Sequence, residues 1–178
     1  MKRLSNHFIH LFRRAAIVGL YFVVVIGVAD QEIRADCSND ASFWVPMKQV
    51  WVEFSAEEKR SLVIAAWMAE SPEQRARGFQ GICPDLVIKR SLLFVFPAPV
   101  HANFHMSSVA VPLDIAFIDV SRQVLDIQRM TLQASNQPMK YYRPSAEFHF
   151  ALETVAGRLD QLRRNPSLWR MRVSNRNQ

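Results

Sequence analysis

Glycine and cysteine are scarce in this chain of 178 residues, and their scarcity excludes several kinds of site. The five glycines do not gather into the glycine-rich loop that cradles phosphate groups. The two cysteines, Cys37 and Cys83, lack the CxxC spacing of cysteine-ligated metal sites. No Ser-His-Asp order or Cys-His pairing of a hydrolase is recognisable either. We therefore expect no metal ion and no cofactor, and whether the protein is an enzyme stays uncertain from its sequence.

Acidic residues are missing from the N-terminus and nearly missing from the C-terminus. Residues 1–29 carry four basic and no acidic side chains, and residues 158–178 carry six arginines against the single acid Asp160. The intervening residues 30–157 carry 12 basic and 15 acidic side chains, a net charge of −3. A nucleic-acid-binding domain usually has a basic core. We therefore expect no nucleic-acid partner.

The segment Ala15–Ala29 is an uncharged, apolar run of 15 residues that follows a basic N-terminus. A membrane-spanning helix needs about 20 such residues, and the shorter run is typical of a signal peptide with a cleavage site after Ala29. We interpret residues 1–29 as a signal peptide, with an uncleaved anchor in the inner membrane through residues 15–29 as the alternative and a buried core helix as a third reading. The first reading predicts an exported protein, periplasmic or extracellular.

The remainder divides into a polar lead, residues 30–47, and one globular domain, residues 48–178. In an oxidising compartment Cys37 and Cys83 could form a disulfide that ties the lead to the domain. Two unrelated buried or free thiols are the alternative, because the sequence does not give the distance between them.

Strands are predicted where β-branched and aromatic residues cluster or alternate with polar ones. These segments are Gln49–Phe54, Leu62–Ala69, Leu92–Phe96, Ile115–Ile118, Val124–Met130, Glu147–Glu153 and Trp169–Val173. Pro97 and Pro99 are expected to end the third of them, and a further short strand is expected at Asn103–Met106.

A short helix is predicted after Ser71, which is a good N-cap, with Pro72 in the first turn and Gln74 as the capping-box partner. Gly78 is placed to end it. One or two helical turns are expected at Arg158–Arg164, whereas Gly81–Arg90 is interpreted as a loop. Strand follows strand without long crossover helices, which predicts a mainly β (α+β) domain: a small antiparallel sheet curled into a partly open barrel with one or two short helices.

Four segments, in order, resemble the motifs of the domain-of-unknown-function 192 family. They are SPEQRARGF, LLFVFP, FHM followed by VPLDIAFID, and FALETVAG. The resemblance covers roughly Leu62–Leu162 and implies a small, mainly β domain, often exported in bacteria, with no accepted catalytic residues. Family members have Trp-Met-Lys-Asn-Thr where this chain has His105-Met106-Ser107-Ser108-Val109.

His105, Asp114 and Glu153 are the candidate residues of a binding cleft. His101 and His105 would lie about 13 Å apart along an extended chain, too far to share a metal directly. Asp114 interrupts an apolar strand, so its carboxylate needs a partner or solvent. Glu153 is conspicuous among apolar neighbours. Arg75 and Arg77 are interpreted as solvated or as partners of these carboxylates.

Two functions are compatible with this pattern. The first is a non-enzymatic exported domain that binds a small ligand or an envelope protein. The second is an envelope hydrolase that uses Asp114 and Glu153 with His105, which requires the three side chains to converge within hydrogen-bonding reach.

Overall fold

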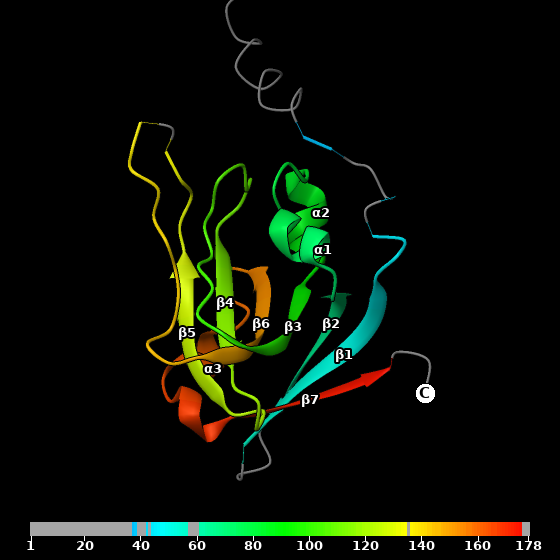
Figure 1. Ribbon diagram of the computed structural model, residues 1–178, viewed down its shortest axis with the longest axis vertical. Helices are drawn as coiled ribbons and strands as arrows, with labels where there is room; N and C mark the ends of the chain where they lie inside the picture. Colours follow the sequence, from blue (N-terminus) through cyan, green and yellow to red (C-terminus); the bar gives the residue numbers. More distant parts are fainter. Residues whose placement is uncertain (1–36, 39–41, 43, 57–60, 135, 176–178) are drawn as a thin grey trace, which may run out of the picture. The chain divides into compact units, whose positions relative to one another are not determined.

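The computed structural model describes residues 37–38, 42, 44–56, 61–134 and 136–175 (Figure 1). The predicted signal or anchor segment, residues 1–29, lies outside these residues, as does most of the lead. Within the described ranges, no helix has both the length and the apolar character needed to cross a membrane.

Seven strands form one sheet in the order β5-β4-β6-β3-β2-β1-β7. Their bounds are β1 Lys48–Ser55, β2 Ser61–Ala69, β3 Leu92–Val100, β4 Leu113–Ile118, β5 Val124–Met130, β6 Phe148–Val155 and β7 Arg170–Asn175. The helical elements are α1 Pro72–Arg77, α2 Pro84–Lys89, α3 Asp160–Arg163 and the short 3₁₀ helix η3 Pro166–Leu168. The predicted mainly β fold is therefore confirmed.

The sheet is curled and stays open. Its edge strands, β5 and β7, approach each other at one end, where Gln123 and Arg170 form an isolated antiparallel bridge. Five of the six neighbouring strand pairs are antiparallel, as expected, but β2 and β3 are parallel. The chain between these two contains α1 and α2, which carry it back to the start of a parallel neighbour (Figure 1).

Two local predictions were wrong, and a third, the short strand at Asn103–Met106, corresponds only to an isolated bridge between Phe104 and Tyr142. The segment interpreted as a loop contains α2, with Pro84 at its N-terminus and Asp85 in its first turn, both of which favour a helix start. The strand expected to end at Pro97 continues as β3 to Val100. The ladder with β6 shifts register between Val95 and Val100. Prolines are tolerated at such an irregularity because no ladder N–H is required there.

The predicted capping box of α1 is confirmed. The Ser71 side chain accepts a hydrogen bond from the backbone N–H of Gln74 at 3.2 Å, and the Gln74 side chain accepts one from the Ser71 N–H at 3.0 Å. These bonds satisfy amides that a helix N-terminus leaves without internal partners. They fix the start of α1, and Gly78 at φ +53° ends it.

Apolar side chains pack in two clusters. Core A includes Phe79, Ile82, Leu92, Phe94, Ile115, Phe117 and Ala151. Core B includes Val52, Phe54, Leu93, Ala116, Ile118, Leu152, Leu159 and Leu162. Successive residues of a strand point to opposite faces, so the alternation of Ile115 and Phe117 with Ala116 and Ile118 places the cores on opposite faces of the sheet.

Cys37 and Cys83 form a disulfide with their Cα atoms 4.8 Å apart. The residues beside them also pair, because the N–H of Ser38 donates to the carbonyl of Gly81 at 2.7 Å and the N–H of Cys83 donates to the carbonyl of Ser38 at 3.3 Å. The lead is thereby tied to the N-terminus of α2.

Candidate functional site

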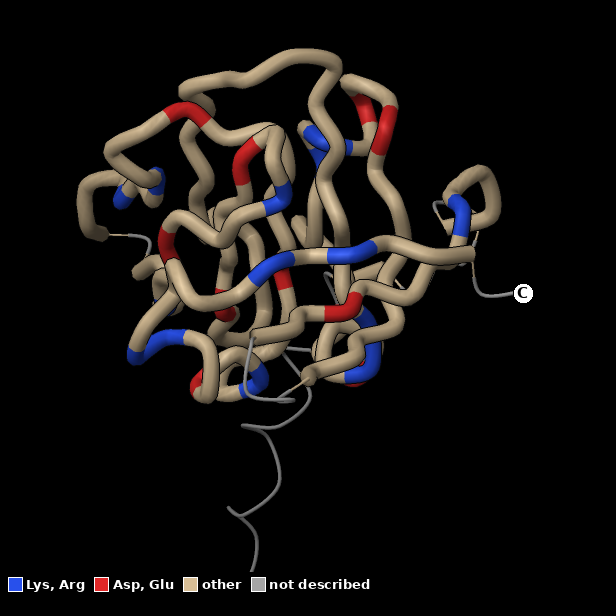
Figure 2. The backbone as a smooth tube through the Cα atoms, turned by 90° about the horizontal axis from the view of Figure 1, so that it is seen from below, with Lys and Arg blue, Asp and Glu red and all other residues tan. Residues whose placement is uncertain are grey.

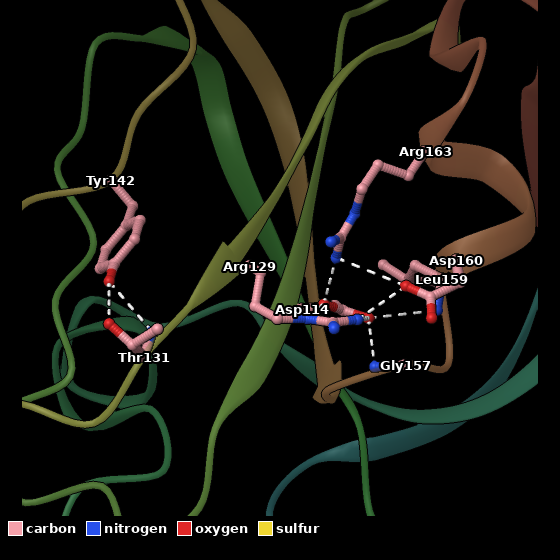
Figure 3. Close-up of polar contacts among 8 residues, drawn as sticks. All are labelled: Asp114, Arg129, Thr131, Tyr142, Gly157, Leu159, Asp160 and Arg163. Carbon is pink, nitrogen blue, oxygen red and sulfur yellow. Dashed lines mark hydrogen bonds and ion pairs between the residues drawn. The ribbon is translucent and has the colours of Figure 1, made fainter.

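Asp114 is fully buried on β4 and is completely paired (Figure 3). Its carboxylate accepts bonds from the guanidinium groups of Arg129 at 3.0 Å and Arg163 at 2.5 Å. It also accepts from the backbone N–H groups of Gly157 at 2.7 Å and Leu159 at 3.3 Å. The same hydrogen bond to Asp114 raises the pKa of Arg129. Asp114 therefore fixes the turn between β6 and α3, which is a structural role.

Asp114 and Glu153 lie on opposite faces of the sheet. Glu153 pairs across the strands with Ile115, a core A residue, and cross-strand partners share a face. Asp114, one position before Ile115, points to the other face, where it contacts Leu159 of core B. The predicted grouping of His105, Asp114 and Glu153 in one cleft is therefore wrong, and the hydrolase arrangement that depended on it is excluded.

Glu153 and His105 do line a common cleft, called here the Glu153 cleft, with a volume of about 360 Å³. It lies on the core A face between α1, β3 and the connection from β3 to β4. Its lining residues are Arg75, Ala76, Arg77, Gly78, Phe79, Gln80, Phe94, Phe96, Ala102, Asn103, Phe104, His105, Val109 and Glu153. Cavities of this size hold small organic ligands in other proteins.

The carboxyl group of Glu153 faces the cleft in largely apolar surroundings. The residue is 5% exposed, and its neighbours in the ladder, Leu92 and Ile115, are fully buried apolar residues. Within the described part of the chain, no hydrogen bond or ion pair reaches its oxygens. Burial raises the pKa of Glu153 from 4.5 to about 8, because a low-polarity environment disfavours the charged form. At neutral pH the side chain is mostly an uncharged acid.

The last turn of α1 forms one rim of the cleft. The Nη1 group of Arg75 donates to the carbonyl of Glu70 and, at 3.0 Å, to that of Val95, and the guanidinium lies 5.2 Å from the centre of the Phe96 ring. Gly78 follows, and a Cβ atom there would lie 3.8 Å from Oε2 of Glu153. Glycine adopts this positive φ readily, and a side chain at this position would come into contact with the carboxyl group.

Aromatic side chains form the apolar wall. The rings of Phe94 and Phe104 meet edge to face with centres 5.2 Å apart, and Phe96 meets Phe148 in the same manner at 5.4 Å. The backbone of Phe104 pairs with that of Tyr142 through two N–H to carbonyl hydrogen bonds of 2.9 and 2.8 Å. Such packing gives the wall a fixed shape.

His105 lies half-buried at the opposite rim. Its Nδ1 atom accepts a hydrogen bond from the N–H of Ser107 at 3.3 Å. A neutral imidazole that accepts at Nδ1 carries its proton on Nε2, so His105 offers a donor. Where the described residues are concerned, no three of His, Cys, Asp or Glu are grouped to hold a metal ion.

Basic and acidic positions are interspersed along the described backbone (Figure 2). The Glu153 cleft combines four phenylalanines and one largely uncharged acid with basic and amide side chains. Sequence reasoning singled out His105 and Glu153, and it interpreted Arg75 and Arg77 as solvated or as partners of the carboxylates. The sequence did contain a signal for the site. The basic SPEQRARG segment ends at Gly78, directly before a turn, so the end of α1 was a position where its arginines could reach a cleft.

The fold and cleft define a class of small domains built on one curled, mainly antiparallel sheet. The chain belongs to the domain-of-unknown-function 192 family, described as "Uncharacterized ACR", whose model matches residues 53–166. It is 28% identical over 86 residues to a UPF0127 protein of Thermococcus sibiricus, a match that covers 47% of this chain. The chain spans about half, 52%, of that relative's length.

Two solved structures share the fold. A protein of Sinorhizobium meliloti 1021, provisionally described as a transcription regulator, matches with a TM-score of 0.58 and 19% identity over 72% of this chain and 95% of its own. A protein of unknown function from Novosphingobium aromaticivorans matches with a TM-score of 0.53 and 20% identity over 72% of this chain and 84% of its own. At these identities the likeness concerns the fold alone.

Proposed function

We propose that this protein is a non-enzymatic binding domain of the cell envelope that holds a small ligand in the Glu153 cleft. The observation that supports binding is the carboxyl group of Glu153, which faces a cleft lined by several phenylalanines and accepts no hydrogen bond from the described residues. A ligand that hydrogen-bonds to Glu153 would give this group a partner, which is worth about 0.5–1.5 kcal/mol.

The test is a thermal-shift screen of a small-molecule library against two variants that differ in one respect. Ala102→Phe places a ring on a residue that lines the cleft, whereas Ala110→Phe places the same ring on an exposed position of the same connection outside it. Compounds that bind in the cleft raise the melting temperature of the wild type and of Ala110→Phe but not of Ala102→Phe. Hits that stabilise both variants equally would place the binding site elsewhere and contradict the proposal.

The envelope location is supported by two features of different kinds. The N-terminal segment has the charge and length of a signal peptide, and the Cys37–Cys83 disulfide is of a kind that persists in oxidising compartments. N-terminal sequencing and thiol labelling of the fractionated protein test this. We expect an oxidised chain that begins at Asp30. A membrane-bound chain that begins at Met1 would support the anchor instead, and a cytoplasmic chain with free thiols would contradict export.

A further inference from the structure

Two arginines and a histidine line the rims of the Glu153 cleft, together with the amide side chains of Gln80 and Asn103. Arg75 and Arg77 line it from α1 and His105 lines it from the opposite rim, where its Nε2–H is available for donation. Both hydrogen bonds of Arg75 to the described residues use Nη1, and a guanidinium has further N–H groups. The rims of the cleft thus favour a ligand with acceptor oxygens.

The floor has the same preference. Glu153 is the one acidic residue among the described residues that line the cleft, and in its uncharged form it donates an O–H. Carboxylic acid to carboxylate bonds are short and about twice as strong as neutral ones. A cationic ligand would gain an ion pair only if Glu153 lost its proton, which its apolar environment disfavours. The positive charges of Arg75 and Arg77 would also repel it.

The apolar residues that line the cleft indicate the chemistry of the rest of the ligand, apart from its acceptor oxygens. Phe94, Phe96, Phe104 and Val109 line the cleft. Flat rings pack on such surfaces with offset or edge-to-face contacts, and arginine at the rim adds attraction for a ring in the same place.

From these groups we propose that the ligand is a small organic carboxylate with an aromatic or other flat apolar body, whose carboxylate bonds to the Glu153 acid and the basic rim. This inference rests on the proposed function, since it names the class of ligand for the same cleft.

The proposal makes the binding dependent on pH in one direction. The groups that face the cleft and carry charge or titrate are Arg75 and Arg77 of α1, His105 of the connection and Glu153 of β6; β3 contributes phenylalanines. When Glu153 loses its proton, two carboxylates confront each other in the cavity. The affinity for a carboxylate therefore falls as the pH rises through the pKa of Glu153, about 8, by about tenfold per pH unit above it when only the protonated form binds.

The experiment uses three probes with one ring and different charges: benzoate, benzyl alcohol and benzylamine. Each is titrated into the ¹⁵N-labelled full chain at several pH values between 6.5 and 9, and the dissociation constant is read from backbone shifts around Gly78 and Glu153. The same titrations are made with Glu153→Gln, which keeps a donor but does not ionise, and with Glu147→Gln. Glu147 is 59% exposed and pairs with His101 outside the cleft, so it is the matched control.

We expect benzoate to bind more tightly than benzyl alcohol, and benzylamine to bind most weakly. Benzoate affinity falls with pH in the wild type and in Glu147→Gln, and it becomes nearly independent of pH in Glu153→Gln, which separates the effect of Glu153 from those of His105 and the arginines. Tighter binding of benzylamine, improving with pH, would overturn the carboxylate inference but leave a ligand-binding cleft. The absence of a benzoate shift would also overturn it, and the proposed function would then fail only if the library screen yields no cleft ligand.

Discussion

Replacing Glu153 with glutamine is expected to remove a large pH dependence from the stability of the protein. Burial holds the pKa of Glu153 at about 8 in the folded protein, against an ordinary value of 4.5. Between these two pH values the folded state retains a proton that the unfolded state has released. The free energy of unfolding therefore falls as the pH rises from 4.5 to 8.

The size of this effect follows from the difference between the two pKa values of Glu153. Each pH unit is worth about 1.4 kcal/mol, so the whole interval corresponds to about 5 kcal/mol, of which about 3 kcal/mol has been lost by pH 7. Glu153 is 5% exposed, so solvent screens this effect little. Glutamine has no proton to lose, and its variant should show a stability curve that is flatter by this amount.

Urea denaturation followed by tryptophan fluorescence, at intervals from pH 4.5 to 8, measures the two curves. The Glu147→Gln variant is the control, because an exposed carboxylate has little influence on the slope. We expect Glu153→Gln to gain stability relative to the wild type steadily with pH, and Glu147→Gln to follow the wild type. Parallel curves for wild type and Glu153→Gln would refute the account, since Glu153 would then titrate as an ordinary solvated acid.

Three further predictions concern groups around the cleft and on the opposite face. Asp114→Ala should lower the free energy of unfolding by about 1–3 kcal/mol, because it leaves the buried N–H of Leu159 without an acceptor and removes hydrogen bonds from the partly exposed Arg129 and Arg163. Asp160→Ala, at a side chain 60% exposed, should cost less than about 1 kcal/mol; equal costs in urea denaturation would contradict the structural role of Asp114. Joint replacement of Cys37 and Cys83 by alanine should cost about 4 kcal/mol, given the 46-residue separation, and a change below about 1 kcal/mol would show that the pairing contributes little. Gly78→Ala should cost about 1–3 kcal/mol, because φ is +53°, and calorimetry that finds it neutral would contradict the assigned turn.

Much of the fold is encoded in local sequence signals. The capping box from Ser71 to Gln74 and the bounds of β5, Val124–Met130, were predicted correctly because each depends on a few neighbouring residues. The helix α2 was missed because its N-cap, Cys83, makes no side-chain capping bond, and the glycine and proline around it are typical of loops as well. The prolines of β3 lie where its hydrogen-bond ladder with β6 is irregular. The sequence of one strand alone does not show such an irregularity.

Which residues line the cleft could not be predicted, because that depends on contacts between segments that are distant in the sequence. The apolar neighbours of Glu153 and Asp114 showed that each was unusual, but a strand pattern does not say which strands pair or in what register. The register of β4 with β6 places Glu153 opposite Ile115, and this alone separates it from Asp114. The parallel pairing of β2 with β3 is likewise a long-range feature, and it is what carries the end of α1 to the cleft.

The most direct test of the account is a crystal structure of the full chain bound to a hit from the library screen. The account predicts density for the compound in the Glu153 cleft, with one of its polar atoms within hydrogen-bonding distance of the Glu153 carboxyl group. Density at another surface, with the cleft empty and the Glu153 carboxyl group still without a partner, would contradict it.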